Sequence, residues 1–352
     1  MQTLLKNGTL IDYKTNTNDQ YDILIENNKI KEIAKEITAP ADKIIDCTNL
    51  NIIPGMIDMH CHLREPGFEY KETIETGSKS AVAGGFTTIC PMPNTKPTPD
   101  SAIILQKILE EAKRVNLCNI LPYGSVSKGE KGEELVDFEE LKQAGAIAFS
   151  DDGMPVVNSK MMRQAIIEAD KLGTFVASHC EEKTVAQGAI NAGKIAEELG
   201  VEGVLPEAEE KDRQAIIEGL KEGTIDCIIT DHAPHSKEEK ERELAKAPNG
   251  IIGFETALSA EIMNLIDTGE MNYLDLVKVT SYNPAKLLHI DRGTIEVGKI
   301  ADITIFDPNE EYVYTEDMIV SKSKNSPFIG KKLKGKVKYT IVGGRIVYGN
   351  NN

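Results

Sequence analysis

Short apolar runs alternate with amphipathic helical patterns through the middle of this chain, and no other feature restricts its fold as strongly. The runs suit buried strands and occur near Ile57 and at 87–90, 120–123, 146–149, 175–177 and 227–230. Between the runs, Asp137 with Glu140 fits a helix-capping box, and Ser159 can open a further helix. Strands that alternate with helices predict an α/β fold built on a parallel sheet or barrel. Functional side chains are then expected at the carboxyl ends of the strands.

The two ends of the chain differ from the middle. Residues 1–53 contain short alternating segments bounded by turn signals, and residues 300–352 carry the same kind of pattern. Such patterns predict strands and tight hairpins. Because chain ends often lie close together, we expect a small β-sandwich subdomain built from 1–53 and 300–352, beside a barrel domain that spans 54–299.

Charge and cysteine content restrict the partners and the compartment. The formal net charge of −16, without a block of lysine or arginine, argues against nucleic acid or an anionic membrane as a partner. The first residues lack a signal-peptide pattern, and no apolar run approaches the roughly 18 residues of a spanning helix. The six cysteines show no CxxC spacing. We therefore expect a cytoplasmic protein with buried free thiols.

Polar residues suited to metal binding or acid–base chemistry follow five of the six runs. They are His60, His62, Asn94, Asp151, His179, Asp231, His232 and His235. A lone histidine is more often a core residue than a ligand, and a lone aspartate is more often a turn residue. Their shared position at the ends of parallel strands reverses that balance, so we expect one common site.

The spacing of His60 and His62 predicts a metal centre. Residues i and i+2 of a strand point to the same face, so both imidazoles can reach one divalent ion. Arg64 follows two positions later, and its planar guanidinium suits the carboxylate of an anionic substrate, although such an arginine forms a surface salt bridge about as often. His232 is expected to support a neighbouring ligand or to pack. The combination favours a metal-dependent hydrolase.

Four motifs occur in an order that resembles one protein family. They are His60-x-His62-Leu63-Arg64-Glu65-Pro66-Gly67, Pro91-Met92-Pro93-Asn94-Thr95, Phe149-Ser150-Asp151-Asp152-Gly153 and Thr230-Asp231-His232-Ala233-Pro234-His235. The chain is similar from end to end to bacterial-type (class I) dihydroorotases of the amidohydrolase superfamily. The resemblance implies a TIM-type barrel. It also implies zinc-dependent, reversible hydrolysis of (S)-dihydroorotate to N-carbamoyl-L-aspartate in de novo pyrimidine biosynthesis.

The same resemblance implies a role for each residue of the site. Two zinc ions would be held, the first by His60, His62 and Asp231. Asp151 would bridge to the second ion, which His179 would also bind. Asp231 would be the catalytic acid and base, carrying a proton from the nucleophilic water to the departing nitrogen. The implied substrate contacts are Arg64, Asn94 and His235.

The chain departs from the family between its fifth and sixth strands. Two further strand–helix units are expected there, including a histidine that completes the second zinc site, and their motifs are missing. Family-like sequence stops and resumes near 207–211, which indicates an internal deletion. The chain has six histidines, and none is spare. We therefore expect a shortened barrel of six strands, weak or absent binding at the second metal site, and impaired catalysis.

Two other functions stay open at the level of sequence. One is a non-catalytic dihydroorotase-like scaffold, favoured by the loss of two units but opposed by the retained ligand residues. The other is a hydantoinase or allantoinase relative, which Arg64 and the Pro91-Met92-Pro93-Asn94 motif disfavour. A small-molecule substrate is expected, with a homodimer or another enzyme of the pyrimidine pathway as a possible protein partner.

Overall fold

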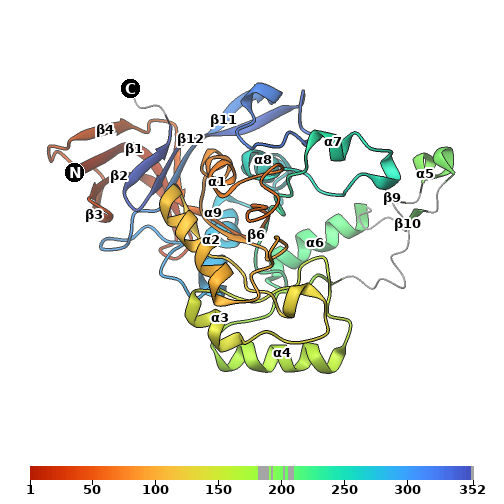
Figure 1. Cartoon of the computed structure of the whole chain (residues 1–352). Coiled ribbons are helices and arrows are strands. Elements are labelled where there is room, and N and C mark those ends of the chain that lie inside the picture. The colour runs from red at the N-terminus through yellow and green to blue at the C-terminus, as the bar shows by residue number, and fades with distance from the viewer. Residues whose placement is uncertain (181–189, 192, 201–202, 205–209, 350–352) are drawn as a thin grey trace.

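The computed structural model describes residues 1–180, 190–191, 193–200, 203–204 and 210–349 (Figure 1). Strands from the two ends of the chain pair in one eight-stranded sheet, in the order β13-β12-β11-β5-β1-β2-β3, with β4 paired to β1. These strands are β1 (Gln2–Asp12), β2 (Thr17–Glu26), β3 (Lys29–Ala34), β4 (Lys43–Asp46), β5 (Asn51–Pro54), β11 (Ile303–Val313), β12 (Lys332–Val342) and β13 (Arg345–Tyr348).

The two ends of the chain meet where β5 lies between β1 and β11. β5 pairs in parallel with β1, through Leu10 and Ile52, and antiparallel with β11, through Ile305 and Ile52. These three side chains are almost fully buried in a cluster of leucine and isoleucine residues. The alternating apolar patterns of both termini therefore form one common core, and the expected pairing of the chain ends is confirmed.

The middle of the chain forms a parallel array on five of the six predicted strand runs; next to the sixth run, 227–230, the pairing falls on His232, two residues after the run. β6 (Met56–Cys61), β7 (Phe86–Pro91) and β8 (Asn119–Ile120) form a three-stranded sheet. Parallel bridges extend it from Gly124 to Phe149 and from Phe149 to Val176 on one side, and from Cys61 to His232 on the other. Within the described residues, no strand pairing joins the Val176 segment to the His232 segment. In this part of the chain, the array is therefore open between the Val176 segment and the His232 segment.

Helices separate the segments of the array along the chain. They are α1 (Ile74–Ala83), α2 (Ala102–Val115), α3 (Phe138–Ala144), α4 (Ser159–Lys171), α5 (Lys194–Leu199), α6 (Glu210–Glu222), α7 (Lys237–Lys240), α8 (Phe254–Glu261), α9 (Tyr273–Val277) and α10 (Asn283–Leu287); the short strands β9 (Ile190–Asn191) and β10 (Gly203–Val204) pair with each other. Asp137 caps α3 as expected by accepting from Glu140 N, while the Glu140 carboxylate accepts from Ala102 N instead of closing the box.

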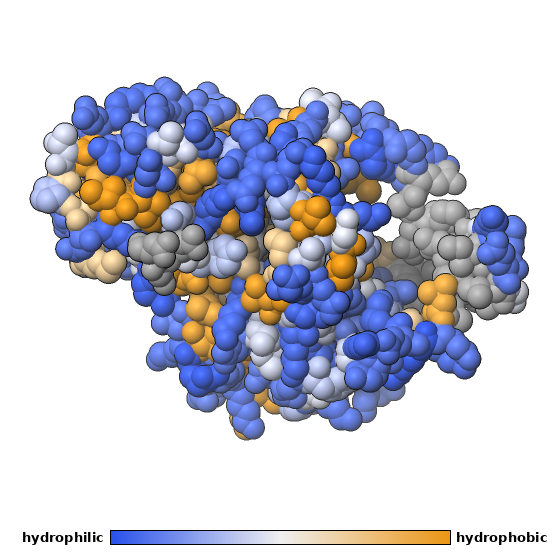
Figure 2. All heavy atoms as spheres, turned by 90° about the horizontal axis from the view of Figure 1, so that it is seen from above, coloured by the Kyte–Doolittle hydropathy of each residue, from blue (hydrophilic) through white to orange (hydrophobic). Residues whose placement is uncertain are grey.

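Three sequence-level expectations meet the structure with different outcomes. The deletion expected near 207–211 falls mostly on residues outside the described part of the chain, and α6 begins directly after them. All six cysteines are free, but Cys180 is exposed and Cys227 is only half-buried, so the expectation of buried thiols is wrong for these two. No helix in the described ranges has the length and apolar character needed to cross a bilayer. The face in Figure 2 is mainly hydrophilic, with scattered apolar patches.

Glu261, at the end of α8, makes a testable contribution to the pH dependence of stability. Its side chain is buried, and its Oε2 atom lacks a hydrogen-bond partner within the described structure. Burial, followed by the charge of Asp58, raises the pKa of Glu261 to about 8. The folded protein therefore holds a proton that the unfolded chain releases near pH 4.5, and stability falls as the pH rises from about 4.5 to 8.

We expect Glu261→Gln to remove this pH dependence. At pH 8 its free energy of unfolding should exceed that of the wild type by at least about 1 kcal/mol, and the difference should vanish near pH 4.5. Urea denaturation of the wild type and of Glu261→Gln at several pH values measures the difference in the free energy of unfolding at pH 8 and near pH 4.5. Glu311→Gln, at an exposed strand position, is the matched control and should change little. A difference between Glu261→Gln and wild type that stays constant with pH would contradict this account.

Candidate metal site

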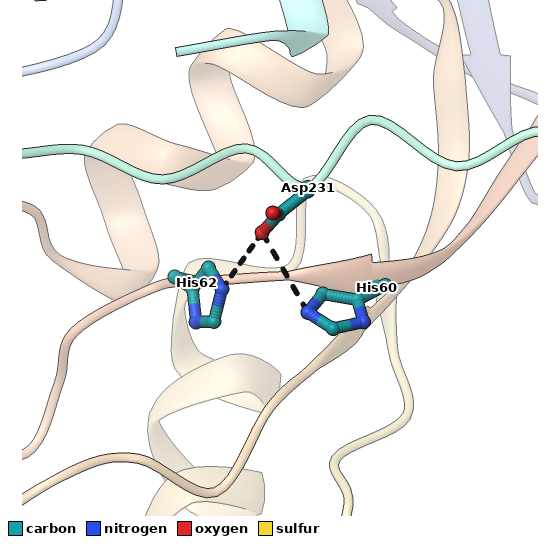
Figure 3. Close-up of side chains that lie close together, drawn as sticks. All are labelled: His60, His62 and Asp231. Atoms are coloured by element: carbon teal, nitrogen blue, oxygen red, sulfur yellow. Dashed lines mark hydrogen bonds and ion pairs between the residues drawn. The ribbon is translucent and has the colours of Figure 1, made fainter. Parts of the chain in front are cut away.

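His60, His62 and Asp231 converge at the carboxyl end of β6 (Figure 3). Their potential ligand atoms all lie within 4.8 Å of one another. Asp231 Oδ1 lies 2.9 Å from His62 Nε2 and 3.6 Å from His60 Nε2. The side chain of His62 is buried, whereas that of Asp231 is 57% exposed. The cluster is therefore fixed on its protein side and accessible on the other.

Asp231 reaches the two histidines because its segment is attached to β6. Cys61 forms a parallel bridge with His232, and His62 N donates to His232 O at 2.9 Å. Below this bridge, the fully buried Asp58 accepts hydrogen bonds from Thr230 N at 3.3 Å and from His60 N at 3.1 Å, and also from the Thr230 hydroxyl. Burial raises the pKa of Asp58 to about 6 despite these hydrogen bonds. One buried carboxyl group thus joins the two segments that carry the cluster.

Asp152, rather than the predicted Asp151, faces the histidines. Asp152 Oδ1 lies 3.2 Å from His60 Nε2, and its Oδ2 lies 3.9 Å from His62 Nε2. Asp151 is turned away, since Oδ1 accepts from Val126 N at 2.7 Å and from Ser127 N at 3.0 Å, and Oδ2 accepts from the Ser127 hydroxyl. Asp151 thus anchors a loop. The sequence predicted Asp151 beside the histidines, and Asp152 occupies that place instead.

The charges in the cluster perturb one another. Burial alone would raise the pKa of Asp152, but the hydrogen bond with His60 and the charge of His62 lower it to about 2. For His60, burial lowers the pKa, and this effect is outweighed by Asp152 and Asp231, so that the net shift is upward. Carboxylates that stay ionised next to buried imidazoles give the site a net negative charge. A divalent cation would neutralise this charge.

Asn94 orients His62. Asn94 Nδ2 donates to Asp152 Oδ2 at 2.6 Å, so the amide oxygen faces His62 Nδ1 at 2.9 Å. This oxygen can only accept, which places a proton on Nδ1 and leaves Nε2 of a neutral imidazole to act as a ligand. The sequence predicted Asn94 as a substrate contact. In the structure both of its polar atoms are engaged by Asp152 and His62.

The donor set fits a divalent transition metal. Zinc bonds of about 2.0–2.1 Å in a tetrahedron separate neighbouring ligand atoms by about 3.3 Å. The separations of 2.9 and 3.6 Å from Asp231 Oδ1 to the two Nε2 atoms bracket this value. Imidazole nitrogen and carboxylate oxygen are common ligands of such ions. Small side-chain movements would bring the three atoms into a coordination sphere.

Arg64 and His235 form a polar pair close to the cluster. Arg64 is 8% exposed, and its Nε donates to Pro234 O at 3.1 Å. Its Nη2 lies 3.5 Å from His235 Nε2. Among the described residues, no carboxylate lies within ion-pair distance of its guanidinium. Burial, followed by the charge of Arg64, lowers the pKa of His235 to about 4, so this imidazole is neutral at pH 7. A buried arginine without a counter-ion can bind an anionic ligand.

His232 and His179 have different surroundings. His232 is fully buried, stacks on Phe254 with centroids 4.1 Å apart, and accepts from Gly253 N through Nδ1 at 3.1 Å. Its expected packing and supporting role agrees with these contacts. His179 is exposed, and it is not part of the ligand-type cluster found among the described residues. The structure therefore does not bring His179 together with His60 and His62.

Sequence reasoning missed one residue beside the histidines and one partly buried carboxyl group whose pKa responds to the charges of Asp151 and Asp152. Asp152 stands next to Asp151 in a turn, where strand alternation no longer decides which side chain points inward. Glu130 was not considered, although its pKa rises to about 8 through burial and then through the charges of Asp151 and Asp152. Its φ of 56° lies in the left-handed region, an unusual backbone conformation that the sequence Lys128-Gly129-Glu130 does not signal.

The chain matches two family descriptions. The model described as Dihydro-orotase-like matches residues 50–218, and the model described as Amidohydrolase family matches residues 253–348. Together they include every residue of the cluster except Asp231, which lies between the two matches.

Curated relatives extend the similarity to the full length. The dihydroorotase of Aquifex aeolicus is 40% identical and that of Clostridioides difficile 39% identical, with alignments that cover 99% and 98% of this chain and 99% of each relative. The first alignment spans 421 positions although this chain has 352 residues, so the relative carries residues that this chain lacks.

Solved structures agree on the fold. An L-hydantoinase from Arthrobacter aurescens superimposes with a TM-score of 0.84 at 22% identity, covering 99% of this chain and 96% of that one. A D-hydantoinase superimposes with a TM-score of 0.80 at 21% identity, covering 100% and 96%. At this identity the likeness concerns the barrel and terminal-sheet architecture alone.

The contrast between the two adjacent aspartates can be tested by metal binding. We expect Asp152→Asn to weaken the binding of Zn²⁺ or Mn²⁺ by about 10–100-fold, because a charge beside the ligands is lost. Asp151→Asn should mainly lower the melting temperature, because its oxygens hold the Val126–Ser127 loop. Titration calorimetry and thermal unfolding of both variants separate these effects. If Asp151→Asn weakened metal binding and Asp152→Asn only lowered the melting temperature, Asp151 and not Asp152 would belong to the metal centre.

Proposed function

The chain belongs to the dihydroorotase family of the amidohydrolase superfamily, and we propose that it interconverts (S)-dihydroorotate and N-carbamoyl-L-aspartate at a zinc centre that contains His60, His62 and Asp231. The family is one of cyclic amide hydrolases, and the substrate is a small molecule. The single observation that carries the choice of substrate is Arg64, a buried guanidinium without an ion-pair partner among the described residues, next to the metal ligands.

Arg64 and His235 would hold the ring carboxylate of dihydroorotate. The guanidinium supplies two or more N–H donors in one plane, which match the two oxygens of a carboxylate. His235, neutral at pH 7, can add one hydrogen bond without repelling Arg64. Hydantoins and dihydropyrimidines without a carboxylate would leave this charge buried and unpaired, which is costly. This contact therefore favours dihydroorotate over the substrates of hydantoinase relatives.

The reaction needs an activated water, a polarised amide and a proton carrier. A zinc ion at the cluster would supply the first two, by lowering the pKa of water and by drawing electrons from the carbonyl oxygen. Asp231 would take the proton of the attacking water and deliver it to the departing ring nitrogen; its side chain is 57% exposed and can face both. Asn94 keeps His62 in the tautomer that offers Nε2. Asp152 stays ionised beside both histidines and compensates the added positive charge.

We also propose that only one metal ion binds tightly. A second ion would need Asp152 as a bridge together with His179 and another histidine, and the chain has no histidine left for that place. A single metal ion with three protein ligands is a known catalytic arrangement for hydrolysis of amides. Activity with one ion, at a reduced rate, is therefore expected. Function in the cytoplasm and association with a second copy or with a pyrimidine-pathway enzyme stay predictions, which fractionation and gel filtration can test.

The proposal can be tested by assaying both directions on protein of known zinc content. We expect turnover of dihydroorotate and of N-carbamoyl-aspartate, with close to one zinc ion per chain by atomic absorption, and loss of turnover after chelation. A stable protein that holds no zinc and turns over neither compound would support the scaffold alternative. Two tightly bound zinc ions per chain would contradict the one-metal proposal but leave the reaction in place.

Substitution of Arg64 tests the substrate assignment. Arg64→Lys keeps the charge but loses the planar fork, so KM for dihydroorotate should rise about 10–100-fold while kcat changes less. Arg114→Lys is the matched control, since Arg114 is 62% exposed and contacts only surface glutamates. An unchanged KM in Arg64→Lys would remove the carboxylate contact from the proposal.

A further inference from the structure

The segment from Ile319 to Ser326 leads from the end of β11 back to β12 and passes the loop that carries His235. Its residue Asn325 uses both ends of its side-chain amide on this loop. Oδ1 accepts from His235 N at 3.1 Å, and Nδ2 donates to Ala233 O at 2.9 Å. These two backbone groups lie on either side of Pro234. The amide therefore bridges the loop across its proline.

Pro234 explains why a side chain is needed there. Proline has no N–H to donate to a neighbouring strand, so the backbone ladder that begins at the Cys61–His232 bridge cannot continue through this position. From outside the array, Asn325 provides a donor for Ala233 O and an acceptor for His235 N. With Ala233 O and His235 N both held, the carbonyl of Pro234 between them has a fixed direction. That carbonyl accepts from Arg64 Nε at 3.1 Å.

Asn325 is itself rigidly held. Its backbone oxygen accepts from Ile252 N at 3.1 Å, and its Nδ2 also approaches Gly250 O at 3.2 Å. The preceding residues are fixed by two buried or half-buried carboxylates. Glu72 accepts from Lys322 N at 3.2 Å and from the Ser321 hydroxyl, and Glu255 accepts from Val320 N at 3.0 Å. Because these contacts hold Asn325 in place, its side-chain hydrogen bonds can orient the backbone groups of the loop.

We propose that Asn325 is a positioning residue for the carboxylate grip: by clamping both sides of Pro234, it sets the positions of Arg64 and His235. The inference rests on the proposed function, since it concerns how the same site binds dihydroorotate. Within the described structure, the Asn325 side chain bonds to backbone groups of His235, Ala233 and Gly250, and not to the ligand atoms of the metal cluster. Its effect should therefore reach substrate affinity while the metal content of the enzyme stays unchanged.

The test compares Asn325→Ala and Asn325→Asp with Ser323→Ala in the full-length, zinc-loaded chain. Asn325→Ala loses both hydrogen bonds to the loop. Asn325→Asp keeps the size and the acceptor for His235 N, but it places a carboxylate oxygen against Ala233 O. Both should raise KM for dihydroorotate by about tenfold or more, with a smaller change in kcat and an unchanged zinc content. Ser323→Ala, which loses only a 2.7 Å hydrogen bond to Lys71 O in the same segment, should leave KM within about twofold.

A double-substitution cycle with Arg64→Lys separates positioning from a general loss of structure. If Asn325 acts through Arg64, the rise in KM caused by Asn325→Ala should be much smaller in the Arg64→Lys background than in wild type. Multiplicative effects, or a normal KM in Asn325→Ala, would overturn the inference. If Asn325→Ala does not fold, the same cycle is carried out with Asn325→Asp.

The same comparisons can be made on dissociation constants for dihydroorotate measured by calorimetry, so they do not depend on turnover. A wild-type chain that neither binds nor converts dihydroorotate would refute the proposed function, and the role of Asn325 in binding this substrate with it. A wild type that binds, together with an unaltered Asn325→Ala, would refute only the positioning role.

Discussion

The attachment of the segment around Asp231 to β6 is the interaction on which the rest of the site depends. His60 and His62 lie at the end of an early strand, whereas Asp231 comes from a distant part of the sequence. The Cys61–His232 bridge and the Asp58–Thr230 contacts join the two segments. Asp58 carries a large part of this constraint, because its buried carboxyl group serves backbone groups of both segments. The metal cluster, the Arg64–Pro234 contact and the position of His235 all follow from the register fixed there.

The site concentrates negative charge that the protein alone compensates only partly. Asp152 and Asp231 lie beside two imidazoles, and the pKa of Asp152 is lowered to about 2, so this carboxylate is ionised at pH 7. Placing ionised carboxylates close together is unfavourable unless a cation is shared among them. Arg64, two residues after His62, is buried and forms no direct ion pair within the described structure, although the charges of Asp152 and Asp231 act on it. A metal ion on one side and an anionic substrate on the other would neutralise both excesses, which is why the two binding events belong to one site.

The sequence predicted the fold and the convergence of His60, His62 and Asp231, and its differences from the structure have definite physical causes. Strand runs and helical periodicity are local signals, so the parallel array along five of the six runs and the pairing of the termini could be anticipated. The choice between Asp151 and Asp152 failed because both lie in a turn, where the Ser127 loop captures one carboxylate. The substrate contact predicted for Asn94 stays a prediction, and motif resemblance does not reveal its hydrogen bonds to His62 and Asp152. Asn325 left no signal at all, since its function consists of contacts to a backbone loop about 90 residues away.

The apparent loss of two strand–helix units need not destroy the metal centre, because of the order of strands in the array. The proposed ligands of the first metal ion lie at the end of β6 and on the segment bridged to it. The residues that contact them, Asn94 and Asp152, follow β7 and the Phe149 segment, and all of these segments pair with described neighbours. His179, in contrast, follows the Val176 segment, the last one in the described array. A deletion at that end removes the neighbour from which a second-site histidine would come. The damage should therefore be confined to the second metal ion, with the carboxylate grip and the first ion preserved by contacts that do not involve the missing units.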